Sequence, residues 1–462
     1  MRRRDFLKGA LGSVAATVLA PSVLRGDIIP DDGTKPLPSM ADVEFDATIF
    51  AANDPQTIVV FLGGGMSDVV GNIQHIDQIR KEALSYSKYP DEGLTPTANG
   101  FWKEAGGDFL ERMFARKELN VFRTCYQTDR IQAHGINQKR YMHGNDRGYD
   151  SGLVTTLLHV LEYYDAISED AKFVNVAIDG GNERLLNDFA MPRPLRPFLR
   201  PVSFNRDFSN PYNYKIDERD LVDLGDYSAN TIFNEAGFDG RLNALMLKNN
   251  HYDALSDVFN KRREISGFIE ERRTAALPVA YPDTIDGRKF ETAMRILSGN
   301  PDTKVVTING GHSGWDDHSN ALPLHRARAY ELFEAIDAAM RHADAIGRDN
   351  LNIVLFGDFG RNMNLNSTGG WDHGNNQVVY WFGGKRFFNH FDKPMGETIL
   401  DERYIASHRL YSRPAENAFQ FRPYSIAATI YALYGIKNPE ILTGGYGVID
   451  PSSHGFSTFL KS

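Results

Sequence analysis

Three histidines and three aspartates gather in two short stretches in the second half of the chain. The first stretch, residues 310–318, reads Gly-Gly-His-Ser-Gly-Trp-Asp-Asp-His, and the second, residues 371–374, reads Trp-Asp-His-Gly. Asp358 lies between them in the sequence. Imidazole and carboxylate are the ligand pair that suits zinc, manganese or iron. If these stretches meet in space, the protein has a metal-centred site.

Each of these carboxylates also has a purely local explanation, because Asp just before a helix often caps that helix. Asp316 with His318, and Asp372 with His373, nevertheless repeat one pattern, and Asp358 follows another predicted strand. This recurrence favours a shared ion site over helix capping alone. Asp372 has a further option, which is to orient His373 as carboxylates do for metal-bound imidazoles.

Several apolar segments predict the strands that would position these residues. They are residues 57–62, 173–178, 304–308, 352–356 and 377–382. The unbroken apolar character of the first is typical of a central parallel strand that is covered on both faces. Residues 325–346 carry apolar side chains at three- and four-residue steps, which predicts an amphipathic helix. We therefore expect an α/β fold with a mainly parallel sheet, whose chemistry lies at the carboxyl ends of the strands.

The region of residues 187–286 has a different character from its surroundings. It is rich in proline at first, and helical spacing returns from about residue 242 to residue 273. We expect an inserted loop and helical subdomain within one domain that spans residues 56–462, after an N-terminal extension at residues 28–55.

The first 27 residues resemble an export signal. Arg2, Arg3 and Arg4 precede Phe6 and Leu7, and a short apolar run follows at residues 9–20. The run is too short for a stable membrane span, so a signal peptide of the twin-arginine (Tat) type is expected, and a basic tail on a cytosolic protein is the alternative. This predicts a periplasmic or secreted protein that uses the Tat translocase during export. No later apolar run predicts a membrane span in the mature chain.

Composition narrows the possible partners and sites. A formal charge of −9 gives no reason to expect nucleic acid as a partner. The single cysteine, Cys125, excludes an intramolecular disulfide and a cysteine-rich metal site. It sits in an alternating, strand-like stretch, so we expect a buried structural thiol. Ser67 and Asp68 follow the first predicted strand, where they would either cap a helix or touch a substrate.

The chain carries a family resemblance in three segments. Residues 57–68 resemble the first strand and metal loop of alkaline phosphatases, and residues 315–361 resemble their later ligand–helix–strand–ligand unit. The motifs Gly-Trp-Asp-x-His (314–318), Phe-Gly-x-Phe-Gly-Arg (356–361) and Asp-His-Gly (372–374) together resemble a Tat-exported family of the alkaline phosphatase/sulfatase superfamily, with no assigned activity. The resemblance implies an alkaline-phosphatase-like three-layer sandwich.

The departures from alkaline phosphatases concern the metal centre. Gly64 stands where those enzymes carry their first metal-binding Asp, and His134 stands where they carry the hydroxyl nucleophile. Phe359 replaces a histidine that would follow Asp358. The resemblance therefore implies one metal ion rather than two.

Together these observations predict a hydrolase of phosphate or sulfate esters, acting on a small molecule or a polymer through a metal-bound water. The expected ligands of one divalent ion, zinc or manganese, are Asp316, His318, Asp358 and His373. His134 is expected to be a further ligand or a general acid/base. Arg361 would stabilise oxyanion charge or form a structural pair with Asp358. The alternative is a catalytically silent binding or assembly protein of the cell envelope.

Overall fold

The computed structural model describes residues 35–129, 131–180, 183–188, 191, 194–209, 264–310, 314–401 and 409–461. The expected Tat signal at residues 1–27 lies outside this described part. So do His312 and residues 210–263 of the expected insertion.

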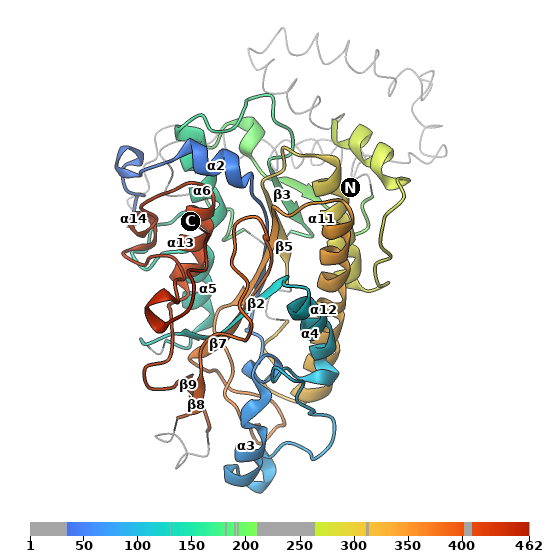
Figure 1. Ribbon diagram of the computed structural model, residues 1–462, viewed down its shortest axis with the longest axis vertical. Helices are drawn as coiled ribbons and strands as arrows, with labels where there is room; N and C mark the ends of the chain where they lie inside the picture. Colours follow the sequence, from blue (N-terminus) through green and yellow to red (C-terminus); the bar gives the residue numbers. More distant parts are fainter. Residues whose placement is uncertain are drawn as a thin grey trace, which may run out of the picture.

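A seven-stranded, mainly parallel sheet forms the centre of the molecule (Figure 1), which confirms the predicted fold class. Its spatial order is β2 (Leu119–Tyr126), β7 (Asn376–Gly383), β6 (Leu351–Gly357), β1 (Gln56–Leu62), β5 (Val305–Asn309), β3 (Asn175–Ile178) and β4 (Val202–Phe204). The run from β6 to β4 is parallel, whereas β7 is antiparallel to both β6 and β2. All five predicted strands are present. Edge strand β4 lies within the span that was expected to be an insertion.

Two hydrophobic cores cover the two faces of this sheet. Every residue of β1 is buried, and alternate side chains point to opposite faces. Ile58 and Val60 belong to the core beneath α4 (Gly107–Ala115), α11 (Ile285–Gly299) and α12 (Ala321–Ala345). Val59 and Phe61 belong to the core beneath α6 (Leu153–Tyr163) and α13 (Tyr424–Leu433). The result is a three-layer arrangement, visible in Figure 1 as helices on either side of the strands.

The amphipathic helix predicted at residues 325–346 is α12, which begins at Ala321. Pro323 lies in its first turn, where backbone N–H groups have no acceptor within the helix. The N–H that proline lacks therefore costs no helical hydrogen bond. The remaining helices are α2 (Ala47–Asn53), α3 (Ile76–Glu82), α5 (His134–His143), α14 (Glu440–Thr443) and a helix at residues 264–273. A small hairpin pairs β8 (Thr398–Leu400) with β9 (Ser412–Pro414). Among the described helices, none has the length and apolar character needed to cross a membrane.

The carboxyl ends of β1, β5 and β6 lie side by side. Phe61 of β1 pairs with Asn309 of β5 on one side and with Phe356 of β6 on the other. The loops that follow these strands therefore leave the sheet at one edge, and they carry the residues singled out in the sequence. The expected buried thiol is also present, since Cys125 of β2 is free and fully buried.

Candidate metal centre

Four side chains converge at the carboxyl edge of the sheet, and each offers one ligand atom. They are His134, Asp316, His318 and His373, and their ligand atoms all lie within 4.8 Å of one another. His134 opens helix α5, Asp316 and His318 lie between β5 and α12, and His373 lies between β6 and β7. The two stretches that were singled out in the sequence therefore do meet in space.

One carboxylate oxygen lies among three imidazole nitrogens. Asp316 Oδ1 is 2.9 Å from His318 Nε2, 3.2 Å from His134 Nε2 and 3.7 Å from His373 Nε2. The Nε2 atoms of His318 and His373 are 3.1 Å apart. Three nitrogens and one oxygen form a donor set typical of a tetrahedral zinc site.

The buried Nε2 of His134 shows that this set fits a metal ion. It has no hydrogen-bond partner among the described residues, although it faces the other three ligand atoms. An unsatisfied buried polar atom is costly, and a cation at this position would satisfy its lone pair.

Asp358 lies behind His134 rather than among the four converging atoms. Its Oδ2 is 2.6 Å from His134 Nδ1 and accepts a hydrogen bond from Gln138 Nε2 at 3.2 Å. Its Oδ1 accepts the backbone N–H of Gly64 at 3.1 Å, and the side chain is fully buried. A carboxylate at Nδ1 holds the proton on that nitrogen and leaves Nε2 free to act as a ligand.

The other two imidazoles are also held from outside the cluster. His373 Nδ1 lies 2.8 Å from the carbonyl oxygen of Gln132, which orients its Nε2 toward the centre. Asp372 flanks His318 instead of its neighbour His373, with 3.6 Å between Asp372 Oδ1 and His318 Nδ1.

Electrostatics prepare these groups to bind a cation. Burial raises the pKa of Asp316, but the hydrogen bond and charge of Arg361 outweigh it, so the pKa lies below its ordinary value and the group is ionised. Burial, helped by the charge of Arg361, lowers the pKa of His373 to about 4, so its imidazole is neutral at pH 7. Burial lowers the pKa of His134, yet the hydrogen bond and charge of Asp358 overcome this and set the pKa above its ordinary value. A bound cation would oppose that last effect, because metal-bound imidazole is unprotonated on its ligand atom.

Arg361 links the loop after β1 to the loop that carries Asp316. Its guanidinium is 1% exposed and donates from Nη2 to Asp316 Oδ1 at 2.7 Å and to the Trp315 carbonyl at 3.1 Å. The same atom donates to the carbonyl of Gly64. Its carboxylate partner is therefore Asp316, not Asp358.

The backbone at Gly64 has no space for a side chain. Its φ is +102°, and a Cβ built there would lie 2.4 Å from Asp316 N and 2.7 Å from the carbonyl carbon of Trp315. A side chain at this position would collide with the backbone of the ligand loop, so only glycine fits.

Asp317 belongs to a different network. It lies 2.7 Å from His325 Nδ1 and pairs through both oxygens with Arg328 at 3.0 Å. His325 Nε2 in turn accepts the backbone N–H of Ser67 at 3.0 Å. These contacts attach the ligand loop to the start of α12 and to the loop after β1.

Two further polar residues reach this region without a clear sequence signal. Gln138 lies four residues after His134 on α5, so both side chains share one helix face. Arg184, in the loop after β3, donates from Nη1 to Gln138 Oε1 at 2.8 Å. The polar stretch around His134 and Gln138 gave no helical prediction from the sequence, and Arg184 sits in an irregular segment that offers no pattern.

Comparisons with known proteins give distant structural similarity only. No protein family model and no curated protein matches the chain. Among solved structures, the zinc complex of the C-terminal periplasmic domain of EcEptC from Escherichia coli is 9% identical over 90% of both chains, with a TM-score of 0.39. Ps i-CgsB in complex with k-i-k-neocarrahexaose is 11% identical over 85% of this chain and 74% of its own, with a TM-score of 0.36. The lipoteichoic acid synthase LtaP from Listeria monocytogenes is 9% identical over 89% and 78%, with a TM-score of 0.32. Similarity at this level does not establish a family or an activity.

Proposed function

We propose that this protein is a metal-dependent hydrolase of phosphate or sulfate esters, exported through the Tat pathway. The observation that carries the proposal is the convergence of four ligand atoms from His134, Asp316, His318 and His373 within 4.8 Å. When bound, a divalent ion supplies Lewis-acid polarisation of an ester oxygen and activates water. Zinc is the preferred ion for three imidazoles and one carboxylate, and manganese is the second choice.

The ligand set proposed from the geometry differs in one member from that expected from the sequence. Asp358 has both oxygens engaged by His134, Gln138 and Gly64, so we assign it to orienting His134. His134 takes its place as a ligand. We propose one ion, because a side chain at Gly64 would clash with the ligand loop and this position therefore offers no further carboxylate.

Two arginines have different roles in this proposal: Arg361 positions a metal ligand, and Arg184 binds the substrate. Arg361 is buried and fixes Asp316, so it positions a ligand rather than meeting a substrate oxygen. Arg184 is half-buried, and its one hydrogen bond within the described residues goes to Gln138. Its other guanidinium donors have no acceptor among the described residues, and Gln138 links it to Asp358 behind His134, so we assign Arg184 to bind the phosphate or sulfate group.

The proposed location and domain plan rest on the sequence. The arginine-rich start and short apolar run at residues 1–27 support Tat export to the periplasm or beyond. We propose that residues 187–286 are an insertion in this domain. Its strand β4 forms one edge of the central sheet.

The test combines elemental analysis with turnover by the purified full chain. About one zinc or manganese per chain is expected, together with hydrolysis of p-nitrophenyl phosphate or p-nitrophenyl sulfate that dialysis against a chelator abolishes. His318→Ala is expected to lose both metal and turnover. His454→Ala, at an exposed histidine outside the cluster, is the matched control and keeps both.

A catalytically silent binding protein is the second candidate. The Arg361–Asp316 ion pair favours it, because the guanidinium neutralises the one carboxylate of the cluster without any ion. Metal-free protein that is fully folded and turns over neither ester would select this candidate and reject the hydrolase.

A further inference from the structure

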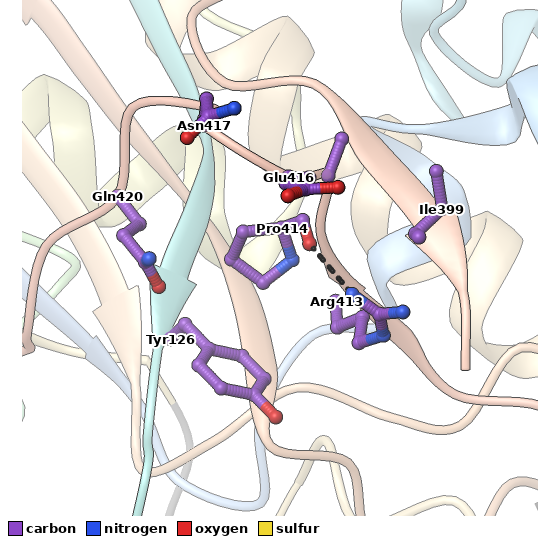
Figure 2. A pocket seen from close by; sticks show the side chains of 8 residues that line it. Tyr126, Ile399, Arg413, Pro414, Glu416, Asn417 and Gln420 are labelled. Atoms are coloured by element: carbon purple, nitrogen blue, oxygen red, sulfur yellow. Dashed lines mark hydrogen bonds between the residues drawn. The ribbon is translucent and has the colours of Figure 1, made fainter. Parts of the chain in front are cut away.

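A pocket separate from the candidate metal centre lies at the end of β2 and against the β8–β9 hairpin. Its volume is about 430 Å³, within the range of about 300–1,000 Å³ found for small-molecule sites. Figure 2 shows Tyr126 and Gln420 on one side and Arg413 and Ile399 on the other, with Pro414 and Glu416 between them. None of its lining residues belongs to the four-residue metal cluster.

The walls of this pocket are held by backbone contacts. Tyr126 N donates to the Phe421 carbonyl at 2.9 Å, which anchors one end of the 415–420 loop to β2. Ala415 N donates to the Glu397 carbonyl at 2.9 Å and anchors the other end. The loop between them turns at Asn417, which has a φ of +61°. The pocket is therefore formed before any ligand binds.

Among the described residues, few of the polar groups of the lining are engaged in hydrogen bonds. Within the described residues, the guanidinium of Arg413 makes one hydrogen bond, from Nη1 to the Pro414 carbonyl at 3.3 Å, and its Nε has no acceptor. Glu416, Asn417 and Gln420 are exposed side chains at the mouth. They add a carboxylate acceptor and two amides that both donate and accept.

This combination fits a neutral polyhydroxylated ring better than an ion. Arg413 and Glu416 carry opposite charges, so the pair does not select an anion or a cation. Asp401 also faces Arg413, with 3.9 Å between Asp401 Oδ1 and Arg413 Nε. The aromatic ring of Tyr126 offers a flat apolar face, while the amides suit hydroxyl groups, which both donate and accept.

We propose that this pocket binds a sugar ring, as a site separate from the metal centre. Tyr126 packs against the C–H face of the ring, and Arg413, Glu416 and Gln420 bind its hydroxyl groups. The site adjoins the metal loop, because Tyr126 pairs with Asn376 across β2 and β7, and Gln127 N donates to the Asn375 carbonyl at 2.8 Å. His373 precedes Asn375 by two residues.

The test is binding of two uncharged probes, maltotriose and N,N′-diacetylchitobiose, to the purified full chain by saturation-transfer NMR and calorimetry. Saturable binding of at least one sugar is expected. Tyr126→Ala and Gln420→Ala should each weaken it by about fivefold or more. Tyr163→Ala, at an exposed tyrosine on α6, is the matched control and leaves binding unchanged. His318→Ala should also leave it unchanged, which separates this site from the proposed hydrolase.

Two outcomes would overturn the proposal. One is the absence of saturable binding by both sugars. The other is binding that neither pocket variant weakens, or that a triglycine peptide matches in the same pocket. Because Gln420 is exposed, its variant tests the pocket even if Tyr126→Ala disturbs folding.

Discussion

Asp358 Oδ2 lies 2.6 Å from His134 Nδ1, and this contact directs the opposite nitrogen of the imidazole into the cluster. Asp358→Asn keeps the size and shape of the side chain but presents an amide to His134 in place of a carboxylate. We expect metal affinity to fall about tenfold to hundredfold, as for other partners of metal-bound histidines. Competition with a chelating dye measures it.

The control for this variant is Asp349→Asn, at a half-exposed aspartate that pairs with Arg386. It removes a carboxylate without touching the cluster and should leave metal affinity unchanged. Equal affinity of Asp358→Asn and the wild-type chain would show that Asp358 does not orient a ligand.

Gly64→Asp adds a carboxylate at the position that the sequence resemblance compares with the first metal-binding Asp of alkaline phosphatases, yet it should not create a second metal site. The backbone at Gly64 has a φ of +102°, and a Cβ would lie 2.4 Å from Asp316 N. We expect a loss of about 3 kcal/mol or more in the free energy of unfolding, since strain and a backbone clash combine. Chemical denaturation measures the loss. Gly447→Ala, where a Cβ meets open space, is the control. Two ions bound by a stable Gly64→Asp protein would contradict the one-ion site.

Much of the sheet was predictable because buried parallel strands are recognisable as continuous apolar runs. β1 is buried along its whole length and was predicted to within one residue. β4 was not predicted, because a three-residue edge strand carries no usable periodicity. The antiparallel direction of β7 could not be predicted from the sequence either. An antiparallel strand that is buried on both faces has the same apolar pattern as a parallel one.

The four residues that converge were all among those singled out in the sequence, whereas their arrangement was not predictable. His318 and His373 lie in the loops that follow two predicted strands, and the structure brings them together. Which carboxylates face the cluster of histidines depends on the path of each loop. Asp316 and Asp317 are neighbours in the sequence, yet the first enters the cluster and the second pairs with Arg328. The path of its loop likewise places Asp358 outside the four converging ligand atoms, where it contacts His134 instead.

Asp68 should make stability depend on pH. It is fully buried, its Oδ2 accepts from Ser412 and Asn376, and its Oδ1 has no partner among the described residues. Burial raises its pKa from 3.8 to about 7, against the effect of these two hydrogen bonds. A carboxyl whose pKa is higher in the folded protein contributes stability at low pH. That stability should be lost as the pH rises from about 4 to about 7.

Asp68→Asn checks this dependence, because the amide stays neutral and its oxygen can accept the same two hydrogen bonds. The melting temperature of the variant should fall less than that of the wild type over this pH range. Asp108→Asn, at an exposed residue of α4, should follow the wild-type curve. Identical slopes for Asp68→Asn and the wild type would show that Asp68 is ionised throughout.

Arg184 should affect the ester group and not the ion. Its one hydrogen bond among the described residues goes to Gln138, which itself binds Asp358. Arg184→Gln removes the charge, so we expect kcat/KM for p-nitrophenyl phosphate to fall about tenfold to hundredfold, the usual effect of losing a charged hydrogen bond. The metal content should not change. Arg273→Gln, at an exposed arginine in the helix at residues 264–273, should have no effect on either quantity. A loss of metal together with activity in Arg184→Gln would instead place Arg184 among the residues that hold Asp358 and His134 in position.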